Sequence, residues 1–331
     1  GSIIKSIIFL TIPIIIGNIL QSAYQLTDAF WVGRLGADSV AAVAISFPII
    51  FLIIAFSGGI GIGASVLVAQ FKGAKNQEMI NKITGQAFFL GVIFSIFFSV
   101  IGYIFSPYLL KLFGAEENVF LYAVNYLRIT FFGMIFVFGY LIYQSVMRGV
   151  GDAKTPLYIV LGTVILNFFL DPLFIFGWKF IPALGVSGAA LATITTQAFA
   201  LIIGIILLYR KKSIIKFNVF YLIPEKNLIK KIIFLGVPIS IEQSSRGSGA
   251  ILMTGLVSGF GTIVLAAYGI GGQMIGLFII ISLSLSISTS ALVGQNIGSG
   301  KIERAEKIAK TGALFGLLFF SFIGVLVFIF A

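Results

Sequence analysis

The sequence predicts an all-α polytopic membrane protein, and its composition and hydropathy lead to that fold class. Of its 331 residues, 59% are hydrophobic and only 10% are charged, whereas a soluble domain carries about 25% charged residues. The mean hydropathy is +1.12. The apolar residues form long runs, and a helix of roughly 20 apolar residues crosses the hydrocarbon core of a bilayer. The chain therefore has no room for a sizeable soluble domain.

Nine apolar spans can be placed along the chain, each long enough to cross a membrane as a helix. They cover about 7–32, 41–70, 84–108, 120–147, 153–177, 184–208, 229–258, 262–294 and 306–331. Of the 22 Lys and Arg residues, only Arg34, Lys111 and Lys179 fall in the loops on one side, and two lie inside spans. Because cytoplasmic loops are rich in Lys and Arg, we expect a multi-pass protein of the inner (plasma) membrane with a cytoplasmic N-terminus.

An internal repeat appears when the chain is shifted by 225 residues, the offset between Pro13 and Pro238. The same offset aligns Gly36 with Gly261, Gln70 with Gln295, and Gly73 with Gly298. Six spans separate the two copies, which is an even number. Both copies therefore enter the membrane from the same side and form parallel repeats.

The repeat divides the chain into two lobes and a linker. We expect an N-terminal lobe of six spans over 1–208, a basic cytoplasmic linker over 209–231, and an incomplete C-terminal lobe of about three spans over 232–331. A second lobe as long as the first needs three more spans. The sequence thus predicts a two-lobe helical bundle of twelve helices, of which this C-terminally truncated chain holds about nine.

Several function classes are excluded by composition. The chain has no Cys and no His, so disulfides, thiol chemistry and histidine catalysis are excluded. Its net charge of +11 lies in short loops rather than on a folded soluble face, so we expect no nucleic-acid partner. We expect a monomer in the lipid bilayer that is not an enzyme and needs no cofactor.

The first span carries a polar stripe on an otherwise apolar helix. Asn18, Gln21, Gln25 and Asp28 follow one another at spacings of three, four and three, which places them on one face. Tyr24, four residues before Asp28, lies beside that face. A stripe that contains a carboxylate cannot face lipid, so it faces partner helices or water.

A second carboxylate, Asp171, lies in the fifth span with its own polar stripe. Thr163, Asn167 and Asp171 are spaced by four and share a helical face. Pro172 disfavours an α conformation at the residue before it, so we expect a strained or broken helix there. The topology places Asp28 and Asp171 near the outer ends of their spans, at similar depth.

These two acids allow two interpretations. In the first, they share one cavity, with Thr193 and Gln197 of the sixth span completing it, and bind a proton or Na⁺. In the second, each acid is hydrogen-bonded separately and only stabilises helix packing. The two polar stripes favour the first interpretation.

Two further features involve spans one and seven. Glu242 and Arg246 lie four residues apart in span seven, as either an internal salt bridge or a second ion or substrate site in the other lobe. Pro13, early in span one, removes a helical hydrogen bond and allows a kink.

Several stretches together resemble the multidrug and toxic compound extrusion (MATE) family of antiporters. They are IPIIIGNILQSAYQLTDAFWVGRLGADSVAAVAISFP, GIGIGASVLVAQFKGAK, VMRGVGDAKTP, and LNFFLDPLFI followed by GVSGAALAT. The pair Asp28 and Asp171 is similar to the acid pair in the N-terminal lobe of the DinF-like branch. The resemblance implies that Tyr24, Asn167 and Thr193 help to form the cation site.

The resemblance also implies a function. It implies export of small cationic, amphiphilic organic compounds in exchange for H⁺ or Na⁺, and it implies that Pro13 marks a bend in span one. The chain departs from the family in stopping within span nine. Glu242 with Arg246 is not part of the DinF-like pattern.

Two alternatives use the same membrane architecture. A flippase for lipid-linked oligosaccharides or lipids, from the same broader superfamily, favours a cavity rich in Arg and Lys, whereas the first lobe offers two carboxylates. An intramembrane aspartyl protease also needs an Asp on each of two spans, in Tyr-Asp and Gly-x-Gly-Asp motifs. Thr27 and Leu170 precede the two acids here, which disfavours the protease.

Overall fold

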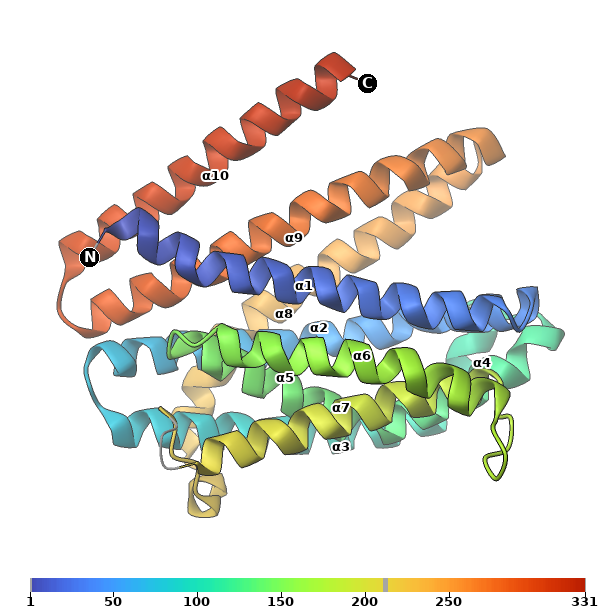
Figure 1. The fold of residues 1–331 in the computed structure, drawn as a ribbon, viewed down its shortest axis with the longest axis horizontal. Coiled ribbons are helices and arrows are strands. Elements are labelled where there is room, and N and C mark those ends of the chain that lie inside the picture. Colours follow the sequence, from blue (N-terminus) through green and yellow to red (C-terminus); the bar gives the residue numbers. More distant parts are fainter. Residues whose placement is uncertain (1, 211–213, 331) are drawn as a thin grey trace.

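The computed structural model describes residues 2–210 and 214–330, and this part of the chain contains only helices and loops (Figure 1). The α-helices are α1 (Ile3–Gly33), α2 (Ala37–Gly73), α3 (Gln77–Leu112), α4 (Glu117–Phe132), α5 (Met134–Gly149), α6 (Lys154–Phe176), α7 (Val186–Tyr209), α8 (Lys226–Ser258), α9 (Thr262–Gly298) and α10 (Ile302–Phe330). A short 3₁₀ helix, η1 (Val219–Leu222), precedes α8. The expected all-α polytopic fold class is confirmed.

Within the described ranges, seven helices are long and apolar enough to cross a membrane: α1, α2, α3, α6, α7, the later part of α9 and α10. An eighth span is formed by α4 and α5 together, which bend by 52° at Gly133. The span expected over 120–147 is therefore a broken one. The side chain of Ile194 from α7 fills the space beside Gly133, where a Cβ atom would overlap it.

The helix α8 does not meet the same test of composition, although it has 33 residues. It begins with Lys226, Lys230 and Lys231 and carries Glu242 and Arg246 in its middle. A helix of this length reaches about 50 Å, so α8 is long enough to cross a bilayer even though its charged residues lower its hydropathy.

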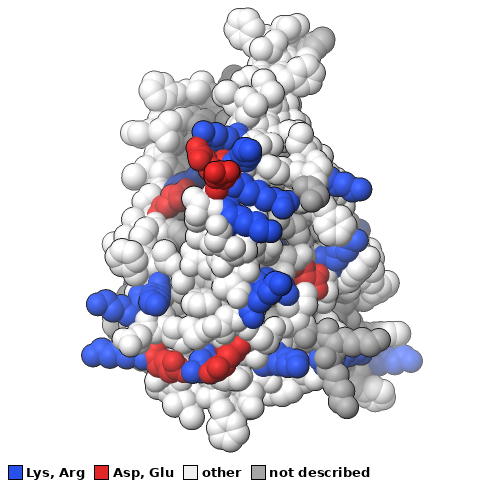
Figure 2. Space-filling view, turned by 90° about the vertical axis from the view of Figure 1, so that its left-hand side faces the viewer, with Lys and Arg blue, Asp and Glu red and all other residues white. Residues whose placement is uncertain are grey.

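One end of the bundle collects the basic residues. The start of α1 and the α2–α3 and α9–α10 turns lie at this end, which we call the basic end (Figure 1). Viewed directly, its surface carries more Lys and Arg than Asp and Glu side chains (Figure 2). The sequence predicts that this end faces the cytoplasm.

Two helix crossings are related by the 225-residue repeat: α2 crosses α8, and α1 crosses α9. In the first, α2 meets α8 through glycines. A Cβ atom at Gly59 would lie 2.6 Å from the Gly236 carbonyl oxygen, and one at Gly63 would lie 2.7 Å from that of Ile232. Backbone therefore packs on backbone there, as small residues allow between membrane helices.

In the second contact, α1 meets α9 through hydroxyl and amide side chains. Thr11 and Ser288 hydroxyls lie 2.5 Å apart, and Asn18 Nδ2 donates to Ser284 Oγ at 3.0 Å. The offset of 225 takes Gly59 to Ser284, Gly63 to Ser288, and Thr11 to Gly236. The same crossing is thus built twice, once from glycines and once from hydrogen-bonding side chains.

A third crossing, between α2 and α9, lies at the basic end. A Cβ atom at Gly73 would overlap the carbonyl oxygen of Gln295, and one at Gly298 would overlap that of Gln70. These two contacts are equivalent under the repeat, because 70 + 225 = 295 and 73 + 225 = 298. Away from the basic end, α8, α9 and α10 diverge from α1 (Figure 1).

The segment between α7 and α8 is held on α3. Gln86 Nε2 donates to the carbonyl oxygens of Tyr221 and Ile223, both at 2.7 Å, and Gln86 Oε1 accepts from the Glu225 backbone N–H at 2.8 Å. One turn earlier, Asn81 Oδ1 accepts from the Lys216 backbone N–H at 2.9 Å. The described part of the linker therefore follows α3 at the basic end.

Proline does not interrupt α1 or α6. The expected break at Asp171 is wrong, because α6 continues through Pro172 to Phe176. Its last turn is capped by the following loop, whose Leu184 and Gly185 backbone N–H groups donate to the Phe174 and Ile175 carbonyl oxygens, each at 3.0 Å. Likewise, α1 is one continuous helix through Pro13.

Candidate cation site

The stripes on α1 and α6 face each other and bring Asp28 and Asp171 together. The carboxyl group of Asp28 lies within interaction range of both Asp171 and Asn167. Asn167 Nδ2 donates to Asp171 Oδ1 at 3.0 Å. Asn167 and Asp171 are completely buried, whereas Asp28 is partly exposed. The two acids therefore share one site.

The helix α7 supplies a third wall through two threonines. Thr193 Oγ1 donates to Asp28 Oδ2 at 3.2 Å. The hydroxyl groups of Tyr24 and Thr196 lie 2.5 Å apart, and Thr196 Oγ1 also donates to the Thr193 carbonyl oxygen at 2.8 Å. The five residues expected at the cation site thus lie together on α1, α6 and α7.

Sequence reasoning missed Thr196 and Tyr126. Thr196 follows Thr193 by three residues on the same face of α7, so helical spacing could have found it. Tyr126 of α4 lies within electrostatic range of both acids. No signal in the sequence relates Tyr126 to them, since it lies in a span without a carboxylate.

Three acceptor oxygens in the site are buried without a hydrogen-bond donor. They are Asp28 Oδ1, Asn167 Oδ1 and Asp171 Oδ2. Buried polar atoms normally have a partner, and a buried carboxylate normally has a compensating positive charge. A Na⁺ ion can take all three atoms as oxygen ligands, and a proton shared between the two carboxyl groups supplies a donor to the acid pair. The donor set fits either ion.

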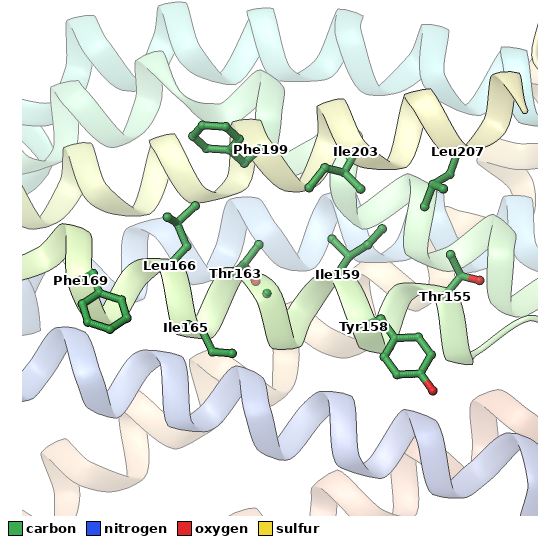
Figure 3. A pocket seen from close by; sticks show the side chains of 11 residues that line it. Thr155, Tyr158, Ile159, Thr163, Ile165, Leu166, Phe169, Phe199, Ile203 and Leu207 are labelled. Atoms are coloured by element: carbon green, nitrogen blue, oxygen red, sulfur yellow. The ribbon is translucent and has the colours of Figure 1, made fainter.

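Of the other residues on the polar stripes, Thr163 takes no part in the site. Its hydroxyl donates to the Val160 carbonyl oxygen at 2.8 Å. Thr163 also lines a groove of about 650 Å³ between α6 and α7 (Figure 3). The side chains around the groove are mostly apolar, such as Ile159, Phe199 and Ile203. None of the residues that form the acid site lines this groove.

Glu242 and Arg246 form an ion pair on α8. Arg246 Nη2 lies 2.7 Å from Glu242 Oε1, and both side chains are more than half exposed, at 56% and 57%. This is the internal salt bridge that their spacing allowed. A second ion or substrate site at these residues stays a prediction.

Comparison with known proteins identifies the family of this chain. The MatE family model matches residues 13–173 and 238–331, two segments that begin 225 residues apart (238 − 13) and together cover most of the chain. The chain belongs to the MATE family. It is a multi-pass membrane transporter of the multidrug-efflux type, and members of this family are transporters rather than enzymes.

Individual MATE relatives agree with this assignment. The chain is 33% identical, over its whole length and 72% of the relative, to the "Probable multidrug resistance protein YoeA" of Bacillus subtilis. It is similar in structure to a MOP superfamily transporter of Pyrococcus furiosus (TM-score 0.90, 25% identity, 100% of this chain and 73% of that one). It is also similar to a multidrug resistance MATE family transporter solved in an outward-facing conformation (TM-score 0.85, 26% identity, 94% and 69%). The DinF-like branch and the C-terminal truncation stay predictions.

Proposed function

We propose that this MATE protein exports small cationic, amphiphilic organic compounds in exchange for H⁺ or Na⁺, with Asp28 and Asp171 as the coupling site. The observation that carries the proposal is the group of three donor-free oxygens on Asp28, Asn167 and Asp171. Buried acceptors of this kind favour a small cation over an anionic ligand. The flippase alternative is not favoured, because the relatives YoeA and YpnP of Bacillus subtilis are named as probable multidrug resistance proteins.

The coupling follows from the position of the site between three helices. Without a cation, Asp28 and Asp171 repel each other across α1 and α6. With a cation bound, the oxygens draw together, and α1 packs more closely on α6 and α7. The ion and the exported compound need not touch, because each needs only to prefer a different arrangement of the same helices. In this scheme the basic end faces the cytoplasm.

Ion-driven efflux tests the proposal. Cells expressing the protein are loaded with a cationic dye, and efflux is followed while pH and Na⁺ gradients are varied separately. We expect Asp28→Asn and Asp171→Asn each to lower ion-driven efflux at least tenfold, because an amide binds neither a proton nor Na⁺ as a carboxylate does. Asp38→Asn is the matched control, since Asp38 is an exposed acid in the first turn of α2.

The outcomes separate clearly. If both variants at Asp28 and Asp171 reach the membrane and pump dye as fast as the Asp38→Asn control, the acid pair is not the coupling site. If they stop efflux of cationic dyes and the wild type also exports neutral or anionic dyes equally well, the coupling site stands but the substrate class is wrong.

A further inference from the structure

A small cavity lies between α2, α5 and α9 near the basic end, apart from the acid site. Its volume is about 30 Å³. Its polar walls are Ser65 of α2, Ser145 and Arg148 of α5, and Ser290 of α9, and the rest of its lining is aliphatic. Ser65 and Ser290 are equivalent positions of the repeat, because 65 + 225 = 290.

Arg148 has no counter-charge in the part of the chain that the structure describes. Its one hydrogen bond there runs from Nη2 to Gln144 Oε1, a neutral acceptor, at the long distance of 3.3 Å. No salt bridge within 4 Å links it to a described carboxylate. The acid nearest in sequence, Asp152, is instead bound to the start of α6, where it accepts from Lys154 and Thr155.

The partly buried charge of Arg148 favours a bound anion. The guanidinium group stays protonated in proteins, so it cannot shed its charge as a buried lysine can. Arg148 is only partly exposed and is surrounded by helices, where an uncompensated charge is costly. Three serine hydroxyls around the same cavity are able to donate hydrogen bonds to an anion held by the guanidinium.

The cavity is small but roomy enough for a monatomic anion. Its volume of about 30 Å³ exceeds the roughly 10–15 Å³ that one water-sized particle needs, and so small a space favours chloride over a larger oxyanion such as sulfate. Ser290 is exposed, which leaves a route to the cavity. The surplus of Lys and Arg at the basic end raises the local concentration of anions (Figure 2).

We propose that Arg148, with Ser65, Ser145 and Ser290, binds a single chloride ion between α2, α5 and α9. Because α9 supplies one wall, the site is complete only while α9 is packed against α2. Beside it, Gln295 Nε2 of α9 donates to the Gly149 carbonyl oxygen of α5 at 3.0 Å, which joins the same helices. A bound chloride therefore favours the arrangement in which these helices are in contact.

Chloride binding is measured on the purified protein in nanodiscs, independently of any transport. At constant ionic strength, chloride replaces gluconate and the thermal unfolding midpoint is recorded. We expect the midpoint to rise and then saturate with chloride, as it does when a ligand binds only the folded state. Bromide is expected to act like chloride, and sulfate is expected to have no effect.

Two site variants and one control make the result specific. Arg148→Gln removes the charge, and Ser290→Val replaces one hydroxyl donor of the cavity wall by apolar atoms while keeping Arg148; both are expected to lose the saturable rise. Arg246→Gln is the control, since Arg246 is paired and half-exposed on α8. It is expected to respond to chloride as the wild type does. If Arg148→Gln fails to fold, Ser290→Val still decides.

A diffraction experiment gives a direct result. In crystals soaked in bromide, we expect an anomalous peak within hydrogen-bonding distance of Arg148. The proposal is overturned if no such peak forms there, or if Ser290→Val keeps the full chloride response. Either outcome means that the cavity holds water only, and neither changes the expectation for the acid pair, whose test is efflux.

Discussion

The contact between α2 and α9 at the basic end can be broken by adding one carbon atom. At Gly298 a Cβ atom would overlap the carbonyl oxygen of Gln70, and at Gly73 it would overlap that of Gln295. Both clashes are with backbone, which no rotamer change relieves. We expect Gly298→Ala to push α9 away from α2 while leaving each helix intact.

The size of the effect follows from the kind of clash. Overpacking a close contact costs about 1–3 kcal/mol, and 1.4 kcal/mol corresponds to a factor of about ten in an equilibrium. If the two helices alternate between a packed and a separated state, Gly298→Ala lowers the ratio of packed to separated molecules by about 5- to 150-fold. The effects of Gly73→Ala and Gly298→Ala should not add, because the two contacts are adjacent.

Electron spin resonance distances between two labels measure the separation. The chain has no native cysteine, so Ala74→Cys and Ser299→Cys place spin labels without a background. Both positions are exposed, directly after α2 and α9. We expect Gly298→Ala to move the distance distribution to longer values. Gly272→Ala, in the same helix but with no atom within 4 Å of its Cβ position, should leave it unchanged. Identical distributions in these two variants would refute the reasoning.

Three further predictions concern single side chains. Tyr24→Phe removes the hydroxyl that meets Thr196 and should lower the free energy of unfolding by about 0.5–1.5 kcal/mol in a denaturant titration; equal stability would contradict this. Gln86→Leu leaves three linker backbone groups without their partner, so hydrogen exchange over residues 214–225 should become faster, and unchanged exchange would show that the linker is held otherwise. Replacing Arg246 by Gln breaks an exposed ion pair with Glu242, so it should change stability by less than about 1 kcal/mol; a larger loss in thermal unfolding would point to a buried role.

Much of the fold could be predicted because bilayer physics leaves few choices for so apolar a chain. The acid pair could also be predicted from the sequence. A carboxylate inside a membrane span must face a partner, and the polar stripes that contain Asp28 and Asp171 show which face of each helix is turned toward that partner. The repeat offset predicted which residues correspond, and Gly73 and Gly298 occupy equivalent places in the structure.

Other features could not be predicted, because they depend on contacts between residues far apart in the sequence. The bend at Gly133 arises where the side chain of Ile194 fills the space beside it, and neither residue signals the other. The helix α6 continues past Pro172, and its last turn is capped by backbone N–H groups of Leu184 and Gly185, a contact that local sequence does not predict. Tyr126 reaches the acids only because α4 packs beside α7.

The way the linker is fastened has a consequence for how the two halves can move. Gln86 and Asn81 bind main-chain atoms of residues 216–225, and the linker side chains of Ile215 and Phe217 pack against the hydrophobic core beside them. The start of α8 is therefore bound to α3 through the hydrogen bond from the Glu225 backbone N–H to Gln86 Oε1. If α8 moves, its first turn therefore stays in place on α3, and the rest of the helix pivots about that end.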